Sequence, residues 1–521
     1  MSADRTALVV SALAALGLVV VVWMLGTGRK PEVLIASMQD QPNILVIDVD
    51  TFSWDHMSVV RNGVSNTPNL DALAARGIKY THAFSHSGWT GPALHSLLTG
   101  ALPAPISVGD KGQKWRPTGT RDLPEVLGYY GYDTYVFWGV SIGEDLGPAL
   151  SKTFKFVSAS PFVDGNQVSK EAEPPTEEVL RFIEGEHSKP FFAYVHEVDL
   201  HHASAFSTFS ADDPCADPTL WQRGMQYQGL YQALVARVGD AAAKDAVKLH
   251  YDLMVGRYDE RIGQMLSALE RTGLDDNTVV VVTSDHGDDF FEHAVVDHGL
   301  LYDSTIRVPL VVADLRNPTN GVVVDDIVQH VDIAPTLLAY AGAKPAITMV
   351  GQPLPHTSGA SDSSYVSRPL YSLSDACHLS WRDADFKLIL RDHAIAHRDW
   401  YPMDITSDRA VNLGSFVQSQ QLTSLQMPPC AGTQMGGLPT QTYLELYDLK
   451  ADPGELVNVA ADHPDDVARM LTALLQALAE RSAAMVGGGG DAMSAEQVEQ
   501  MKAKGYWGFI DPTAAVPAAG Q

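Results

Sequence analysis

Cysteine is scarce in this sequence. Only three of its 521 residues are cysteines, namely Cys215, Cys377 and Cys430. Their spacing matches no zinc-finger pattern, and three cysteines allow one disulfide with one thiol left over. The sequence therefore predicts a chain that relies on a large hydrophobic core and not on a disulfide framework.

Positive charge is scarce as well. Lysine and arginine together number 36, against 63 acidic residues, which gives a formal net charge of -27. A nucleic acid would be repelled by such a chain, so we exclude a nucleic-acid partner. An anionic substrate would need local positive charge, and a bound metal ion is the simplest source of it.

Long apolar runs are absent except near the N-terminus. Residues 7–26 are almost wholly apolar and long enough to cross a bilayer. A cleaved signal peptide usually has a shorter apolar core, so we expect an uncleaved N-terminal anchor, with a cleaved signal as the alternative. The basic residues Arg5, Arg29 and Lys30 flank the run on both sides and indicate no orientation.

Changes in composition divide the chain into four predicted segments. We expect an anchor and tether at 1–41, an α/β catalytic domain at 42–345, a smaller subdomain at 346–484, and a Gly-rich linker and tail at 485–521. Short strand-like runs in the third segment predict a small antiparallel sheet. An amphipathic helix at 463–483 is expected to pack on that sheet.

Three apolar strands end in side chains that bind metals. The strands are predicted within residues 42–50, 190–202 and 278–287. The C-terminal ends of parallel strands meet at the edge of an α/β sheet where ligands bind. Asp50, Asp285 and His286 are therefore candidate metal ligands at that edge. Asp48 lies deeper in the first strand, and we interpret it as a buried, hydrogen-bonded structural acid.

A hydroxyl group stands at the predicted start of a helix. Residues 87–100 are predicted to be a loop that turns into a helix, with Pro92 suited to the first turn. Backbone N–H groups and the helix dipole favour an anion at such a start. Thr90 there is either a simple helix cap or a nucleophile that a nearby metal activates. The three strand ends favour the nucleophile.

The remaining elements follow from periodicity and capping signals. Helices are predicted at 67–77, 123–130, 176–185 and 248–273, and further strands at 134–138 and 307–312. Residues 203–235 have no clear period. We expect them to form an irregular insertion over the site, either a lid or a substrate-selecting loop.

Several motifs, in order along residues 42–505, resemble the sulfatase branch of the alkaline phosphatase superfamily. They are the opening strand at 42–51, the helix at 67–74, Leu-Leu-Thr-Gly at 97–100, Ser-Asp-His-Gly at 284–287, Arg-Val-Pro at 307–309, the closing strand and turn at 445–458, and a tail at 493–505 like that of anchored bacterial members. The resemblance implies a central, mostly parallel sheet flanked by helices, with a smaller C-terminal antiparallel sheet plus helix. It also implies a catalytic domain outside the cytoplasm, in a bacterial cell envelope.

The resemblance implies one metal site. Asp50, Asp285 and His286 match metal ligands of the family, and Thr90 occupies the nucleophile position, where it would complete the metal shell. Two carboxylates and one imidazole suit Zn or Mn, whereas Ca is the usual ion in sulfatases.

Two histidines match substrate-binding positions. His201 corresponds to a substrate-binding histidine of the family, and His298 falls where sulfatases often place a lysine that holds the ester's anionic oxygens. Both are expected to bind those oxygens or to protonate the leaving group. We interpret Asp199 and His202 as residues that contact the metal ligands or lie on the surface. The alternative is that they bind a second metal ion together with His298.

The nucleophile motif departs from that of most sulfatases. Those enzymes oxidise Cys or Ser to formylglycine, and Thr90 cannot give that aldehyde. Ala93 and Leu94 also replace the usual Ser and Arg. We therefore favour a hydrolase or transferase of phosphate esters, phosphodiesters above all. The alternatives are a sulfuric ester hydrolase that works without formylglycine and a catalytically inactive binding protein.

Overall fold

The computed structural model describes the chain over sixteen stretches. These are 41–103, 121–138, 154, 156–159, 176–201, 213–217, 220, 227–293, 296–346, 348–357, 365–375, 378–392, 411–420, 434–435, 438–439 and 442–487. The predicted anchor at 7–26 and residues 488–521 of the predicted linker and tail lie outside these residues, and both stay predictions. The start of the linker at 485 was wrong, because the last helix continues to Gly487. No helix within the described ranges is both long and apolar enough to cross a bilayer.

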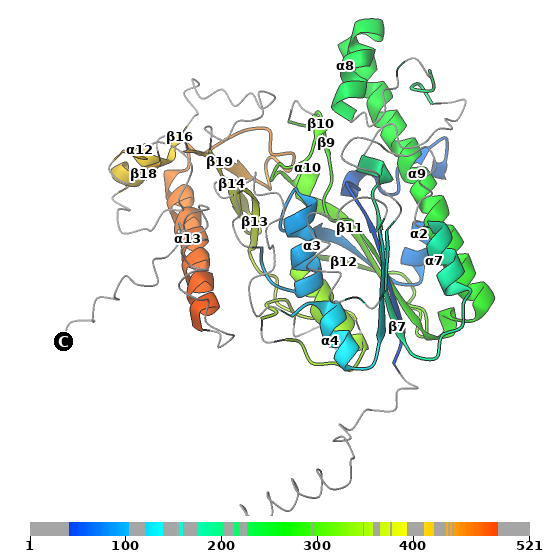
Figure 1. Cartoon of the computed structure of the whole chain (residues 1–521). Coiled ribbons are helices and arrows are strands. Elements are labelled where there is room, and N and C mark those ends of the chain that lie inside the picture. Colours follow the sequence, from blue (N-terminus) through cyan, green and yellow to red (C-terminus); the bar gives the residue numbers. More distant parts are fainter. Residues whose placement is uncertain are drawn as a thin grey trace, which may run out of the picture. The chain divides into compact units, whose positions relative to one another are not determined.

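An eight-stranded sheet forms the centre of the fold (Figure 1). Its strand order is β12 (Val322–Gln329), β4 (Ile78–Phe84), β11 (Arg307–Asp314), β8 (Thr278–Thr283), β1 (Asn43–Val49), β7 (Phe191–Glu197), β5 (Asp133–Trp138) and β6 (Phe156–Ala159). Every neighbouring pair is parallel except those of β11, which runs antiparallel to β4 and β8. The predicted mostly parallel sheet is confirmed.

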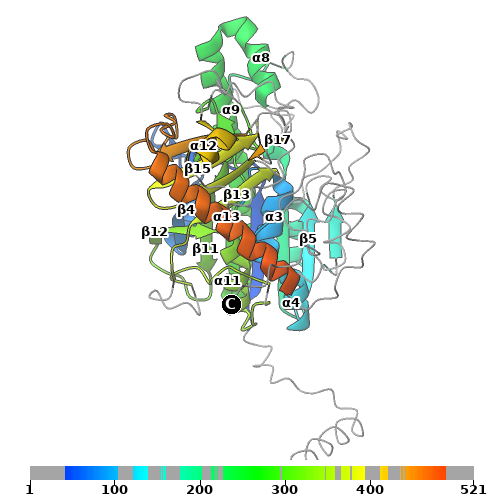
Figure 2. The same cartoon turned by 90° about the vertical axis from the view of Figure 1, so that its left-hand side faces the viewer.

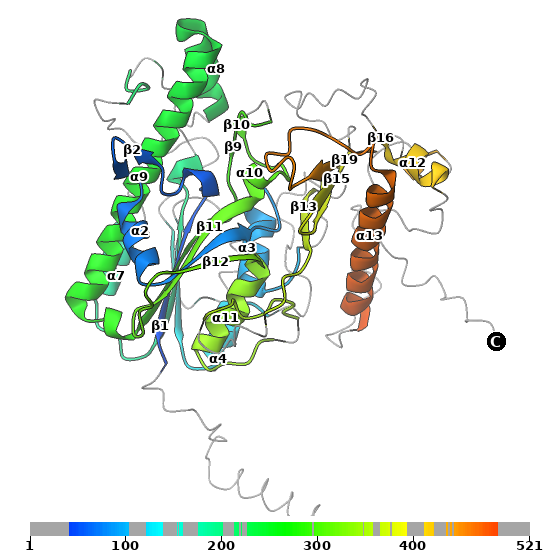
Figure 3. The ribbon, with the colours of Figure 1, turned by 180° about the vertical axis from the view of Figure 1, so that it is seen from behind.

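Helices cover both faces of this sheet (Figures 1 and 3). One side carries α2 (Pro68–Ala75), α7 (Thr176–Ile183) and α9 (Asp240–Thr272), and the other carries α3 (Thr90–Thr99), α4 (Leu123–Tyr129) and α11 (Ile333–Tyr340). Alternate residues of a strand point to opposite faces, so Leu45 and Ile47 enter the first core whereas Ile44 and Val46 enter the second. Burial on both faces explains why β1 and β8 are almost wholly apolar.

A second, five-stranded antiparallel sheet lies in the C-terminal part of the chain. Its order is β13 (Leu370–Asp375), β14 (His378–Arg382), β15 (Phe386–Asp392), β19 (Thr442–Asp448) and β16 (Val411–Asn412). The helix α13 (Pro464–Gly487) crosses it (Figure 2) and packs Val467, Leu471 and Leu474 against Leu388 and Leu390. The predicted antiparallel sheet with its covering helix is confirmed, while the boundary at residues 345 and 346 stays a prediction.

The end of the predicted insertion at 203–235 is helical, within the residues that the structure describes. The helix α8 (Tyr227–Val238) begins inside it, and α9 starts at Asp240 instead of residue 248. Tyr227, Leu230 and Leu234 form a short buried stripe on α8 that packs beside α9. This stripe is too short for periodicity alone to reveal, so the prediction of an irregular segment was wrong over 227–235.

The shorter elements connect the larger ones. They are η2 (Trp54–His56), β2 (Val60–Arg61), β3 (Val64–Ser65), η4 (Asp199–His201), η5 (Asp275–Asn277), β9 (Asp289–Phe290), β10 (Val296–Asp297), α10 (Asp303–Ile306), η6 (His330–Asp332), α12 (Leu413–Ser419), β17 (Gln434–Met435) and β18 (Leu438–Pro439). Three of them, η2, η4 and η6, follow the C-terminal ends of β1, β7 and β12, at the edge of the central sheet where the site is predicted.

Candidate active site

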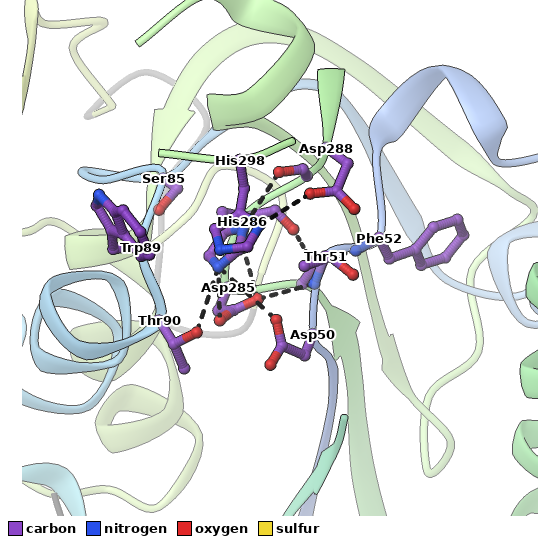
Figure 4. Close-up of polar contacts among 12 residues, drawn as sticks. Asp50, Thr51, Phe52, Ser85, Trp89, Thr90, Asp285, His286, Asp288 and His298 are labelled. Atoms are coloured by element: carbon purple, nitrogen blue, oxygen red, sulfur yellow. Dashed lines mark hydrogen bonds and ion pairs between the residues drawn. The ribbon is translucent and has the colours of Figure 1, made fainter. Parts of the chain in front are cut away.

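The predicted metal ligands meet at the C-terminal ends of two neighbouring strands (Figure 4). β1 and β8 are parallel and in register, with Asp48 opposite Thr283, so the residues that follow them emerge side by side. Asp50, Asp285 and His286 are buried, and their ligand atoms lie within 4.8 Å of one another. The structure therefore brings together the three side chains that the sequence singled out.

The inward-facing atoms of this cluster fit a cation. His286 Nδ1 lies 3.1 Å from the Gly287 carbonyl oxygen, so it carries the proton, and Nε2 presents a lone pair. That lone pair faces Asp285 Oδ2 at 3.4 Å and Asp50 Oδ1 at 3.7 Å. Neither oxygen has a hydrogen-bond partner in the part of the chain that the structure describes. Buried, unpaired acceptors in mutual contact are unfavourable, and a divalent metal ion would satisfy all three.

The other carboxylate oxygen of Asp285 fixes its orientation. Asp285 Oδ1 accepts hydrogen bonds from the backbone N–H groups of Thr51 and His286, at 3.2 and 2.8 Å. Burial and the nearby carboxylates of Asp50 and Asp48 raise the pKa of Asp285 well above its ordinary value. Burial, together with the charge of His298, lowers the pKa of His286 to about 4, so this ring is neutral at neutral pH.

A buried polar chain lies beneath Asp50. Asp48 Oδ2 accepts hydrogen bonds from the Tyr194 hydroxyl at 2.5 Å and from His196 Nδ1 at 2.8 Å. The Nε2 atom of His196 faces Asp50 Oδ2 at 3.7 Å. Burial opposes protonation of His196, but the two carboxylates outweigh it and raise its pKa to about 10. Asp48 is thus a hydrogen-bonded structural acid, as its sequence position indicated.

Sequence reasoning did not assign His196 to the site. Asp48 on β1 and His196 on β7 are directly opposite in the sheet. That pairing depends on the register of two strands 148 residues apart, which no local pattern reveals. The only signal in the sequence was its position in an apolar strand just before His201.

Thr90 is the first residue of α3 and is directed toward the metal-ligand cluster. Trp89, in extended conformation, takes the cap position, so the cap interpretation of Thr90 is wrong. The Thr90 hydroxyl lies 3.3 Å from His286 Nε2 and can donate a hydrogen bond to it. Ala93 and Leu94, which replace the usual Ser and Arg, are fully buried in the core.

The two candidate substrate-binding histidines also converge here. The His298 ring lies 4.9 Å from the His286 ring, 4.7 Å from His201 and 4.9 Å from Trp89. Its Nδ1 pairs with Asp288 Oδ1 at 3.1 Å, a contact that the sequence did not predict. The alternative second metal site stays a prediction, because His202 and the side chain of Asp199 lie outside what the structure describes.

Family models match two parts of the chain. The model described as Sulfatase matches residues 42–343, which is more than half of the chain. The model described as N-sulphoglucosamine sulphohydrolase, C-terminal, matches residues 291–422. The first match contains all six candidate site residues.

Individual relatives cover most of the chain at low identity. The N-acetylglucosamine-6-O-sulfatase of Bacteroides thetaiotaomicron is 22% identical over 504 residues, covering 80% of this chain and 82% of the relative. Human arylsulfatase A is 24% identical, covering 84% of this chain and 86% of the relative. The structure of the phosphonate monoester hydrolase of Agrobacterium radiobacter superposes with a TM-score of 0.56 and 20% identity, over 85% of this chain and 96% of that one. At this identity the superposition shows a shared fold.

Proposed function

We propose a function from the premise that this chain belongs to the sulfatase family, within the alkaline phosphatase superfamily. A member of that family is a hydrolase, and family members typically bind a divalent metal. Our proposal is a metal-dependent ester hydrolase that uses Thr90 as its nucleophile and prefers phosphoesters, phosphodiesters above all. The observation that carries it is the Thr90 hydroxyl, 3.3 Å from His286 Nε2 at the edge of the carboxylate cluster.

The identity of the nucleophile separates phosphate from sulfate chemistry. A formylglycine hydrate releases sulfate by eliminating it from a carbon that bears a second hydroxyl group. The Cβ atom of Thr90 bears a methyl group and one oxygen, so an ester on Thr90 has no such route. It must be cleaved by attack at the central atom of the transferred group. Direct displacement at phosphorus is the chemistry on which phosphoryl transfer depends, and this favours phosphoesters.

The residues of the chain have distinct tasks in this reaction. A divalent ion held by Asp50, Asp285 and His286 would lower the pKa of the Thr90 hydroxyl and offset the charge of the substrate. The Thr90 hydroxyl gives up its proton to solvent, and its Oγ1 atom attacks phosphorus, forming one P–O bond while the bond to the leaving alcohol breaks. His201 or His298 donates a proton to that alcohol and contacts the remaining oxygens. Water, or an acceptor alcohol, then attacks phosphorus and restores Thr90.

A sulfuric ester hydrolase with unmodified Thr90 is the second candidate. It is favoured by the relatives, because the N-acetylglucosamine-6-O-sulfatase and arylsulfatase A bear names that state sulfate-ester substrates. The identities of 22 and 24% leave room for a change of substrate.

A substrate screen distinguishes the candidates. Protein loaded with Zn, Mn or Ca is assayed with an aryl phosphodiester, an aryl phosphomonoester and an aryl sulfate. We expect phosphodiester turnover that falls at least about 10³-fold in Thr90→Ala and survives in Thr90→Ser, since the serine keeps the hydroxyl. Turnover of the sulfate alone would select the second candidate, and no turnover of any ester would indicate a binding protein.

The location of the enzyme is a separate proposal. We propose that residues 7–26 anchor the chain in a membrane and that the catalytic domain lies outside the cytoplasm. The support is the length and apolarity of this run. Carbonate extraction of membranes tests it, because an anchored chain stays in the pellet whereas a protein with a cleaved signal is released.

A further inference from the structure

A second group of metal-binding side chains lies away from the candidate active site. Asp213, Cys215 and His250 are all buried, and one ligand atom of each lies within 4.8 Å of the other two. The reaction described above uses none of these residues. We propose that they form a second metal site, one that binds a zinc-like divalent ion and has a structural role.

A tight turn places two of the three ligands. The Cys215 N–H group donates to Asp213 Oδ1 at 2.8 Å, and the Ala216 N–H group donates to the Asp213 carbonyl oxygen at 3.1 Å. These bonds bring the carboxylate and the thiol, two residues apart, within reach of one ion. Two ligands that are so close in the chain can bind one ion together, and the third ligand completes the site.

The third ligand comes from the long helix α9. His250 is fully buried on this helix, and its Nδ1 atom lies 2.8 Å from Asp213 Oδ2. The cluster thus joins residues 213–217 to a helix that belongs to the main core. Structural zinc sites likewise combine ligands that are close in the chain with ligands from another element, but they usually have four protein ligands, whereas this cluster supplies three.

The ligand types select a zinc-like ion. Zinc binds thiolate sulfur, imidazole nitrogen and carboxylate oxygen, and this cluster offers one of each. The candidate active site has no thiol, so the second site is the softer of the two. A thiolate and a carboxylate would neutralise the two positive charges of the ion, the thiol proton leaving to solvent, and a water molecule would complete the tetrahedron. Ligand atoms around a tetrahedral zinc ion lie about 3.3–3.8 Å apart. The ligand atoms of this cluster lie within 4.8 Å of one another, and an ion would replace the 2.8 Å contact between His250 Nδ1 and Asp213 Oδ2.

The position of this site connects it with the catalytic edge of the sheet. Tyr251, next to His250, donates from its hydroxyl to the Thr51 carbonyl oxygen at 2.5 Å and accepts from the Ser53 N–H group at 3.0 Å. Thr51 directly follows Asp50. An ion at His250 would therefore fasten residues 213–217 to the part of α9 that supports the first strand end.

Cobalt loading of the full chain tests the proposal without an activity assay. A cobalt–thiolate bond gives a charge-transfer absorption band in the near ultraviolet that oxygen and nitrogen ligands do not give. We expect the wild-type chain to show this band and to retain two ions after desalting. Cys215→Ser should lose the band and one ion, whereas Asp285→Asn should keep the band and lose the other ion.

Two controls make the result specific. The double variant Cys377→Ser, Cys430→Ser should keep the band, because neither thiol belongs to the proposed site. X-ray absorption of the zinc-loaded wild-type chain, which needs no variant, should show one sulfur at about 2.3 Å from zinc. One retained ion, no cobalt–thiolate band and no sulfur neighbour would overturn the proposal and leave a metal-free Asp213–His250 pair beside a buried thiol.

Discussion

Without a bound cation, the acceptor atoms of the candidate metal cluster repel one another. Asp285 Oδ2 and Asp50 Oδ1 both face the lone pair of His286 Nε2 and have no hydrogen-bond partner among the described residues. The raised pKa of Asp285 reflects this conflict, which arises from burial and from the neighbouring carboxylates. The arrangement is costly for folding and suited to binding a metal, as is common at functional sites.

The variant Asp285→Asn should therefore change stability in opposite directions with and without metal. The folded-state pKa of Asp285 lies above the ordinary 3.8, so its contribution to stability is full below about pH 3.8 and is lost as the pH rises through the raised value. Asparagine does not ionise. In a chelator at pH 7, thermal denaturation should show that the variant is more stable than the wild type.

Metal addition should reverse that order. Binding at 100 times the dissociation constant stabilises a folded protein by about 2.7 kcal/mol, and the variant should lose most of this gain at the catalytic site. Asp326→Asn, on an exposed part of β12, is the matched control and should follow the wild type under both conditions. A variant that is less stable than the wild type in chelator would show that the carboxylates are not in conflict.

At the scale of elements, the approach of two loops positions the nucleophile. The loop before α3 meets the segment after His298, where the Gly299 N–H group donates to the Gly88 carbonyl oxygen at 2.8 Å. A Cβ atom on Gly88 would lie 2.4 Å from the Leu300 carbonyl oxygen, which leaves no space for a side chain. Contact between these two backbones therefore keeps Thr90 close to His298.

Gly88→Ala should separate these loops. We expect a loss of about 1–3 kcal/mol in the free energy of unfolding and a larger fractional loss of kcat than of substrate affinity. Gly128→Ala is the matched control, since no atom lies within 4 Å of the added Cβ on the exposed side of α4. That control should be neutral or slightly stabilising. Equal kcat for Gly88→Ala and the wild type would contradict this role of the loop contact.

Elements with a strong local pattern could be predicted from the sequence. The β-branched strand Thr278–Thr283 and the helix Pro68–Ala75, which has proline in its first turn, both lie where the sequence pattern placed them. The strand Ile78–Phe84 was missed, because lysine and histidine interrupt its apolar residues, and its place in the sheet comes from pairing with two distant strands. The helix Tyr227–Val238 was missed because packing against α9 decides its structure.

The same distinction applies to the candidate site. Asp50, Asp285 and His286 could be predicted because parallel strands bring their C-terminal ends together whatever the details of packing. Contacts between side chains of different segments could not be predicted from the sequence. The Asp288–His298 pair and the His196–Asp48 pair both depend on geometry that appears only after the sheet has formed.

At the scale of the whole molecule, a buried lysine joins the C-terminal sheet to the central one. Lys387 on β15 is fully buried and pairs with Asp303 of α10 at 2.7 Å and with Glu455 at 2.9 Å. Asp303 is the first residue of α10, and α10 leads directly into β11 of the central sheet. The single ammonium group thus pairs with two carboxylates from separate parts of the chain, and Arg382 adds a second positive charge at 3.5 Å from Asp303.

Lys387→Met should destabilise the molecule strongly, because it removes the cation that contacts the buried Glu455 and leaves Asp303 with the longer, 3.5 Å contact to the Arg382 guanidinium. We expect a loss of about 3–5 kcal/mol, measured by urea denaturation. Lys450→Met is the matched control, since Lys450 pairs with Asp385 on the surface and should contribute less than about 1 kcal/mol. Similar losses for the two variants would show that the buried pair does not hold the sheets together.

The central claim is that Thr90 forms a covalent bond to the substrate. Metal-loaded protein is mixed with an activated aryl phosphodiester, quenched in acid within the first turnover, digested and analysed by mass spectrometry. We expect a phosphoester on the peptide that contains Thr90 and none on the same peptide of Thr90→Ala. Turnover of the diester with no modification of Thr90, or with the adduct on another residue, would contradict it.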